Sequence, residues 1–192
     1  MSLDWALFRA LNGLAGRWPL FDRVVQFLMN DYALTTALSA LLVALWFRGQ
    51  TREERESDQA TVVHALVALI LASVAVKGLN LLFFRQRPFA VHEVNLIFYH
   101  PSDSSLPSNA ATVSFVFAVG VLQRSRALGL IGIAVGLLLG LSRVIGGVHY
   151  PLDIVAGAVL GSGAVLLVRR YRRALGPLAR GVRRLAGLVL LA

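Results

Sequence analysis

The sequence predicts an all-helical integral membrane protein with about five transmembrane helices and an N-terminal helix in the membrane interface. Hydrophobic residues make up 57% of the 192 residues and charged residues only 15%, and the mean hydropathy is +0.69, far above that of a soluble domain. The apolar residues also gather into long stretches. Because a segment in lipid must satisfy its backbone hydrogen bonds internally, we expect these stretches to be helices.

The N-terminal region, residues 1–30, is predicted to hold an interfacial helix and a connection. Apolar residues recur at helical spacing between Leu3 and Leu14, and the polar residues Asp4, Arg9 and Asn12 lie among them. This pattern is typical of a helix that lies in the surface of a membrane.

Residues 31–172 are predicted to form the transmembrane core. Five apolar segments, the third of them short for a span, occupy it at approximately Asp31–Phe47, Ala60–Phe84, Ala110–Gln123, Ala127–Val144 and Pro151–Val168. Glycines in the last two segments recur at a spacing that permits close helix packing. The same spacing could serve a homodimer interface.

The arginines indicate how the core is oriented. They gather in the turn after the first span, in the turn after the third and in the tail, residues 173–192, which we interpret as a basic helix lying on the surface. The positive-inside rule places these segments in the cytoplasm. The loop at 85–108 and the turn at 143–151 then face outward, and we expect a bacterial inner-membrane protein with its active site outside.

The formal net charge of +9 and the absence of cysteine limit the function classes. The basic residues lie mostly between apolar segments, so we expect them to contact lipid headgroups and not nucleic acid. Disulfides, thiolate nucleophiles and cysteine-ligated metals are excluded.

Polar residues without a role in topology form three clusters near the outer ends of the predicted spans. Ionisable residues at such places are costly and are usually functional. The clusters are Lys77, Asn80, Arg85, Gln86, Arg87 and Pro88; then Pro107, Ser108 and Asn109; then Ser142, Arg143, His149 and Asp153.

These clusters together suit phosphoryl chemistry. Arg87 and Arg143 offer forked donors that match phosphate oxygens, and a helix that starts near Ser108 favours an anion at its free N–H groups. If the last span begins near Pro151, Asp153 can accept a hydrogen bond from His149 and leave the other ring nitrogen free to attack.

With these residues the chain resembles the type 2 phosphatidic acid phosphatase (PAP2) superfamily of membrane lipid phosphatases. The third family motif is matched completely by Ser142, Arg143, His149 and Asp153. The resemblance implies a PAP2-type helical bundle in which His149 forms a phosphohistidine, Asp153 orients it, and Arg87, Arg143 and Ser108 hold the phosphoryl group, with Asn109 beside them. It implies a lipid phosphate or diphosphate substrate, no metal and no other cofactor.

Two motif positions depart from the family pattern. The Lys of the first motif is Asn80, for which Lys77, three residues earlier, is a possible substitute in phosphate binding; alternatively, Lys77 pairs with a polar group within the membrane. The His of the second motif, which protonates the leaving group, is Ala110. His92 and His100 in the outer loop are candidate substitutes for it.

The missing acid favours a diphosphate substrate. An alkoxide leaving group is about as basic as hydroxide, whose parent water has a pKa near 15.7, whereas the second pKa of a phosphate monoester is roughly 6. A lipid diphosphate can therefore tolerate the loss of general acid catalysis, typically worth about 10²–10⁴-fold, better than phosphatidic acid can.

The sequence thus predicts a metal-independent hydrolase of a polyprenyl diphosphate such as undecaprenyl diphosphate. Because Ala110 and Asn80 replace motif residues, two alternatives stay open. One is a protein of the same fold that binds or transports lipid phosphates without hydrolysis. The other is a phosphotransferase that passes the phosphoryl group to an acceptor lipid.

Overall fold

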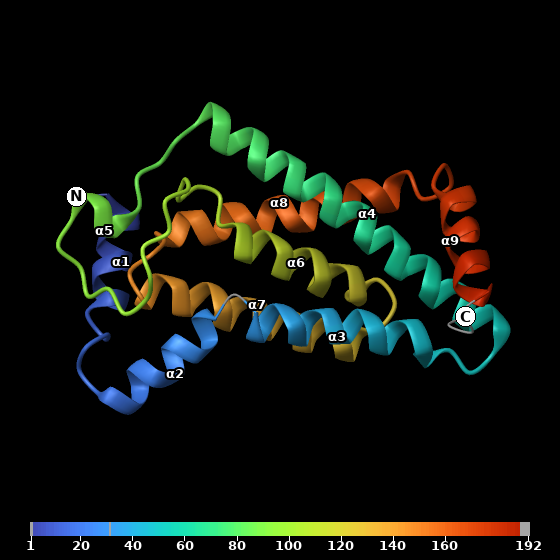
Figure 1. Ribbon diagram of the computed structural model, residues 1–192, viewed down its shortest axis with the longest axis horizontal. Helices are drawn as coiled ribbons and strands as arrows, with labels where there is room; N and C mark the ends of the chain where they lie inside the picture. Colours follow the sequence, from blue (N-terminus) through green and yellow to red (C-terminus); the bar gives the residue numbers. More distant parts are fainter. Residues whose placement is uncertain (1, 31, 189–192) are drawn as a thin grey trace.

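A computed structural model describes residues 2–30 and 32–188, and all regular secondary structure in this part of the chain is helical (Figure 1). The helices are α1 (Leu3–Asn12), α2 (Pro19–Met29), α3 (Ala33–Arg48), α4 (Arg52–Leu82), α5 (Pro88–Val91), α6 (Asn109–Leu122), α7 (Arg126–Ile145), α8 (Pro151–Arg170) and α9 (Gly176–Leu188). The predicted first residue of the core, Asp31, and the end of the tail, 189–192, lie outside the described residues.

The prediction of an all-helical membrane protein is confirmed, and three or four of the described segments are long and apolar enough to be spans. Among the described residues, α4, α7 and α8 are long and apolar enough to cross a bilayer, and α2 and α3 pass the same test together although they are bent by 48°. The remaining apolar helix, α6, has 14 residues. At 1.5 Å per residue it rises about 21 Å, which is less than the hydrocarbon core of about 30 Å.

Two helices extend beyond what the apolar stretches predict. Helix α4 begins at Arg52, well before the predicted Ala60, because Thr51 accepts a hydrogen bond from the Glu54 backbone and the Glu54 carboxylate accepts one from the Thr51 backbone. Helix α2 lies where the sequence predicts a connection. Apolar length in the sequence indicates neither feature, because the start of α4 is polar and α2 has only 11 residues.

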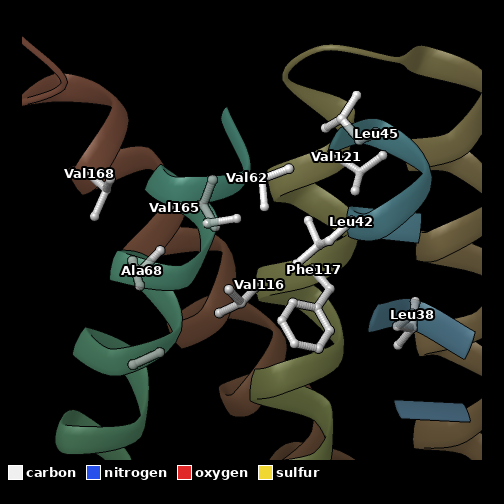
Figure 2. Close-up of a cluster of buried hydrophobic side chains, with 13 residues drawn as sticks. Leu38, Leu42, Leu45, Val62, Ala68, Val116, Phe117, Val121, Val165 and Val168 are labelled. Carbon is white, nitrogen blue, oxygen red and sulfur yellow. The ribbon is translucent and has the colours of Figure 1, made fainter. Parts of the chain in front are cut away.

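The apolar core lies between α3, α4, α6 and α8 (Figure 2). Leu38 and Leu45 of α3, Val116 and Val121 of α6, and Ala68 of α4 are all fully buried there. The buried charged residues lie beyond this core, at the two ends of the bundle.

Glycines of α8 bring this helix directly against α6. A Cβ atom at Gly157 would lie 3.0 Å from the Ala111 Cβ, and one at Gly161 would overlap the Thr112 carbonyl. The close packing that the glycine spacing predicts therefore occurs within the bundle, at the start of α6.

The two ends of the bundle are built differently. At one end the buried carboxylate of Asp58 accepts two hydrogen bonds of 3.0 Å from Arg48 and one of 2.6 Å from Arg124, which joins α3, α4 and the turn after α6. Helix α9 lies across this same end, beside the start of α4 (Figure 1). At the other end α1, α5 and the loop before α6 come together.

The helix predicted near the N-terminus is present as α1, and it docks onto the bundle. Phe8 is 1% exposed and packs with Val144 and Tyr150. The buried Asn12 side chain donates hydrogen bonds of 2.8 Å to the carbonyls of Asn95 and Ile145. Helix α1 thus braces both the long loop and the end of α7.

Candidate active site

A pocket of about 300 Å³ opens at the end of the bundle where the long loop meets the starts of α6 and α8. Four of the residues predicted from the sequence line it, and they come from four separate segments. They are Arg87, Asn109, Arg143 and His149. The tertiary structure therefore unites the three polar clusters.

His149 lies in the short turn between α7 and α8. The turn passes through Gly147 at φ +88°, a conformation that favours glycine. The His149 Nδ1 lies 2.9 Å from the Ser105 carbonyl, which can only accept a hydrogen bond, so Nδ1 carries the proton. The unprotonated Nε2 atom then accepts a hydrogen bond of 3.1 Å from Arg87 Nη1, which has only donors. This nitrogen is the candidate nucleophile.

Asp153 lies behind His149 in the first turn of α8, fully buried. Its Oδ2 is 3.6 Å from His149 Nδ1, too far for a hydrogen bond, so the Ser105 carbonyl and not this carboxylate accepts the ring proton. The carboxylate accepts hydrogen bonds of 2.5 Å from Ser105 Oγ and 2.9 Å from the Tyr150 backbone. It acts on the ring through its charge and through Ser105.

Arg85 joins this carboxylate to the N-terminal helix. Its guanidinium donates to Asp153 at 2.5 Å and to Asp4 at 2.6 Å, and it lies 4.1 Å from the centre of the Tyr150 ring. Asp4 also accepts a hydrogen bond of 2.9 Å from the Leu152 backbone at the start of α8. The pair of Arg85 and Asp4 thus supports Asp153.

Sequence reasoning missed the part that Ser105 and Asp4 play. Ser105 stands in a polar run with several serines, and Asp4 lies in α1, far from the motifs along the chain. No spacing distinguishes either residue, because each reaches the site only through tertiary contacts.

The two arginines of the pocket are held by main-chain carbonyls. Arg87 donates to Val148 O at 3.0 Å and to the carboxylate of Asp103 at 2.8 Å. Arg143 donates to Met29 O at 3.1 Å. Both are almost fully buried, with 6% and 4% of their surface exposed. Two buried guanidinium groups at one pocket match an anion with several oxygens, such as a phosphate.

Ser108, Asn109 and Ala110 lie at the start of α6. Ser108 is buried and caps the helix, with its Oγ accepting from the Ala111 backbone at 3.4 Å. Its own N–H donates to the Asp153 carbonyl at 3.0 Å. Asn109 and Ala110 line the pocket directly. The first turn of α6 therefore faces the space where a phosphate would bind.

The structure leaves four candidate residues away from the pocket. Lys77 is exposed on α4 and Asn80 is half-buried there, and neither lines the pocket. His92 stacks on Trp5 with ring centres 3.9 Å apart, and His100 meets Phe89 edge to face. Neither histidine lines the pocket beside Ala110.

The environment of His149 favours the neutral ring. Burial lowers the pKa of the His149 imidazole below its usual value, and the positive charges of Arg87 and Arg143 lower this pKa further, against the opposing effect of Asp153. The ring is therefore held in its nucleophilic form at neutral pH.

The chain resembles known membrane phosphatases over most of its length. Residues 61–177 match the model of the PAP2 superfamily. The chain is 29% identical over 175 residues to undecaprenyl-diphosphatase BcrC of Bacillus subtilis, which covers 91% of this chain and 87% of that relative. It is also 29% identical over 183 residues to a lipid A 1-phosphatase of Rhizobium etli, covering 87% and 78%.

A solved structure shows the same arrangement of helices. The crystal structure of LpxE from Aquifex aeolicus superposes with a TM-score of 0.70 at 28% identity, covering 89% of this chain and 97% of that one. The similarity therefore includes the whole bundle that positions the pocket.

Proposed function

Because the chain belongs to the PAP2 superfamily of membrane phosphatases, we propose that it hydrolyses a lipid diphosphate, of the polyprenyl class, through a phosphohistidine. The observation that carries this proposal is the placement of His149. Its Nε2 faces a pocket lined by two buried arginines, and its Nδ1 proton is held by the Ser105 carbonyl.

The proposed reaction has two steps. The Nε2 electron pair attacks the terminal phosphorus, a P–N bond forms, and the bond from phosphorus to the bridging oxygen breaks, which releases the lipid monophosphate. Water then attacks the phosphohistidine, releases inorganic phosphate and restores the ring. Arg87 and Arg143 would neutralise the charge that develops on the transferring phosphoryl group.

Ala110 supports the choice of a diphosphate over a monoester. It lines the pocket at the position where the family motif has its proton donor, and its methyl group cannot donate. A lipid monophosphate is a good leaving group without protonation, whereas the alkoxide of a monoester is not. The resemblance to undecaprenyl-diphosphatase BcrC is consistent with this choice.

The outer surface of a bacterial inner membrane is the proposed place of this reaction. Arginines at the opposite end of the bundle would lie in the cytoplasm under the positive-inside rule. Residues 31–172 would then form the catalytic core, with residues 1–30 bracing it and the tail, 173–192, on the inner surface.

Phosphate release by the purified protein in detergent tests the proposal. The substrates are undecaprenyl diphosphate and phosphatidic acid, and a metal chelator is present throughout. We expect release from the diphosphate, slower release from phosphatidic acid by about 10²-fold or more, and loss of both in His149→Ala.

Other outcomes would favour one of the alternatives. Transfer of phosphate to an added lipid acceptor in place of release would indicate a phosphotransferase. No release or transfer by folded protein that still binds the lipid would indicate a binding or transport protein. Equal rates on both substrates would contradict the argument from Ala110.

A further inference from the structure

A second pocket lies at the end of the bundle opposite the active site, between the start of α4 and the crossing helix α9. Five arginines and one glutamate line it, together with Gln59. The arginines are Arg52 and Arg55 of α4 and Arg180, Arg183 and Arg184 of α9. This charge is gathered from two helices that are far apart in the sequence, so it is a property of the fold.

The carboxylate in the pocket pairs with only two of these arginines. Glu56 lies 3.3 Å from Arg52 and 3.3 Å from Arg183. No carboxylate of the described residues lies within ion-pair distance of Arg55, Arg180 or Arg184. The pocket therefore keeps an excess of positive charge at its wall.

A buried amide points to a ligand independently of the arginines. Gln59 is 2% exposed and lines the pocket, and its Nε2 has no hydrogen-bond partner among the described residues. Buried amide donors are rarely left unsatisfied, because the loss of hydration costs free energy. The amide nitrogen is itself closed off from the pocket, so the side chain would have to rotate for this donor to meet an oxyanion that the arginines bind.

The position of α9 indicates where such an anion comes from. Helix α9 lies across the end of the bundle (Figure 1), and Leu178, Leu185 and Leu188 are exposed along it. A helix with exposed leucines and arginines, set across the membrane-spanning helices, is typical of one that lies at the level of lipid headgroups. Its arginines are then at the depth of lipid phosphates.

We propose that this pocket binds the phosphate of an anionic lipid headgroup in the leaflet opposite the active site. The proposal does not depend on the reaction assigned to His149, since the two sites share no residue. It assigns to the tail a binding function beyond lying on the surface. The lipid would hold α9 against the start of α4.

A titration with phosphatidylglycerol tests the site, because this lipid is a phosphodiester and offers no terminal phosphate to the active site. The full-length protein is purified in neutral detergent, and its thermal unfolding midpoint and the lipid retained in native mass spectrometry are followed. The pocket variant carries Arg180→Gln and Arg184→Gln. The control variant carries Arg170→Gln and Arg173→Gln, which removes the same charge at the same end but outside this pocket.

We expect saturable stabilisation of the wild type and the control variant. The pocket variant should need about 30-fold more phosphatidylglycerol, because it lacks two arginines and each arginine near a charged surface contributes about 1 kcal/mol. Gln59→Glu, which places a carboxylate at the buried end, should weaken binding in the same way. Phosphatase activity in detergent should remain in all three variants.

Several results would overturn the proposal. Equal lipid responses in the pocket and control variants would show that the arginines act only as a diffuse surface charge. Stabilisation by inorganic phosphate with none by phosphatidylglycerol would assign the pocket to a soluble anion. An unchanged stabilisation of Gln59→Glu by phosphatidylglycerol would show that the Gln59 amide takes no part in lipid binding.

Discussion

At the scale of single residues, the proposed nucleophile His149 contacts a serine that no motif includes, Ser105. The Ser105 carbonyl accepts a hydrogen bond of 2.9 Å from His149 Nδ1, and the Ser105 hydroxyl donates one of 2.5 Å to Asp153. The carbonyl sets the tautomer, and the hydroxyl ties the carboxylate to the same loop. In the proposed reaction Ser105 would be a positioning residue, which acts on phosphorus only through His149.

We predict that Ser105→Ala lowers kcat while KM changes little. A hydrogen bond to a charged group is worth roughly 1.5–3 kcal/mol, so the rate should fall by about 10–100-fold. Ser102→Ala, at an exposed position in the same loop, is the matched control. If both variants hydrolyse substrate like the wild type, the hydroxyl has no part in positioning.

The lowered pKa of His149 gives a prediction about pH. Because burial and the two arginines disfavour the charged ring, the neutral nucleophile persists as the pH falls below about 6.5, the usual pKa of histidine. Activity should therefore decline only as the pH falls through the lower pKa of the folded protein.

Nitrogen NMR of histidine-labelled protein measures this titration directly. The signals of His149 are identified by their loss in His149→Asn. We expect them to titrate below about 6.5, the usual pKa of histidine. A pKa of 6.5 or above would show that Asp153 outweighs burial and the arginines.

At the scale of elements, the contact between α8 and α6 positions both Ser108 and Asp153. Gly157 and Gly161 permit it, since a side chain at either would meet the backbone of α6. The Ser108 N–H then reaches the Asp153 carbonyl at 3.0 Å. The separation of these two helices is therefore part of the geometry of the site.

Two glycines of α8 provide a matched test of this contact. A Cβ atom at Gly161 would overlap the Thr112 carbonyl, whereas one at Gly163 would have no atom within 4 Å. We predict that Gly161→Ala destabilises the protein by about 1–3 kcal/mol. Gly163→Ala should be neutral or stabilising, because alanine favours a helix by up to about 1 kcal/mol.

Thermal unfolding in detergent and phosphate release compare these two variants. A lower midpoint and lower activity in Gly161→Ala alone would support close packing as the function of Gly161. Equal behaviour of the two variants would show that α8 can move away from α6 without cost.

At the scale of the whole molecule, the two ends of the bundle carry different groups of polar residues. One end holds the active-site pocket and α1, and the other holds the Asp58 cluster, α9 and the basic pocket. If the bundle crosses the membrane, these ends face opposite compartments. The positive-inside rule then predicts that the candidate active site faces outward.

Because the chain has no cysteine, single cysteines can test this orientation. Ser102→Cys lies in the loop at the active-site end, and Glu53→Cys lies at the exposed start of α4. In spheroplasts with an intact inner membrane, a membrane-impermeant maleimide should label the Ser102→Cys variant. It should label Glu53→Cys only after permeabilisation, and the reverse pattern would place the active site in the cytoplasm.

The sequence by itself determined the class of fold, the family and the residues at the centre of the pocket. Apolar length requires helices in lipid, so most of α3, α4, α6, α7 and α8 could be located directly. His149 and Arg143 could be identified because both belong to one motif, whose residues lie close together in the sequence. The absence of a proton donor at Ala110 was equally visible.

Only the tertiary structure decided how these residues are supported and where the arginines of the tail gather. Asp4, Ser105 and Asp153 come from three distant segments, and a hydrogen bond between such segments leaves no periodic pattern in the chain. Lys77 and Asn80 lie near Arg87 in sequence, yet neither lines the pocket. Both belong to α4, which ends at Leu82, whereas Arg87 lies in the segment after this helix, which reaches His149. The basic pocket likewise exists only because α9 crosses the start of α4.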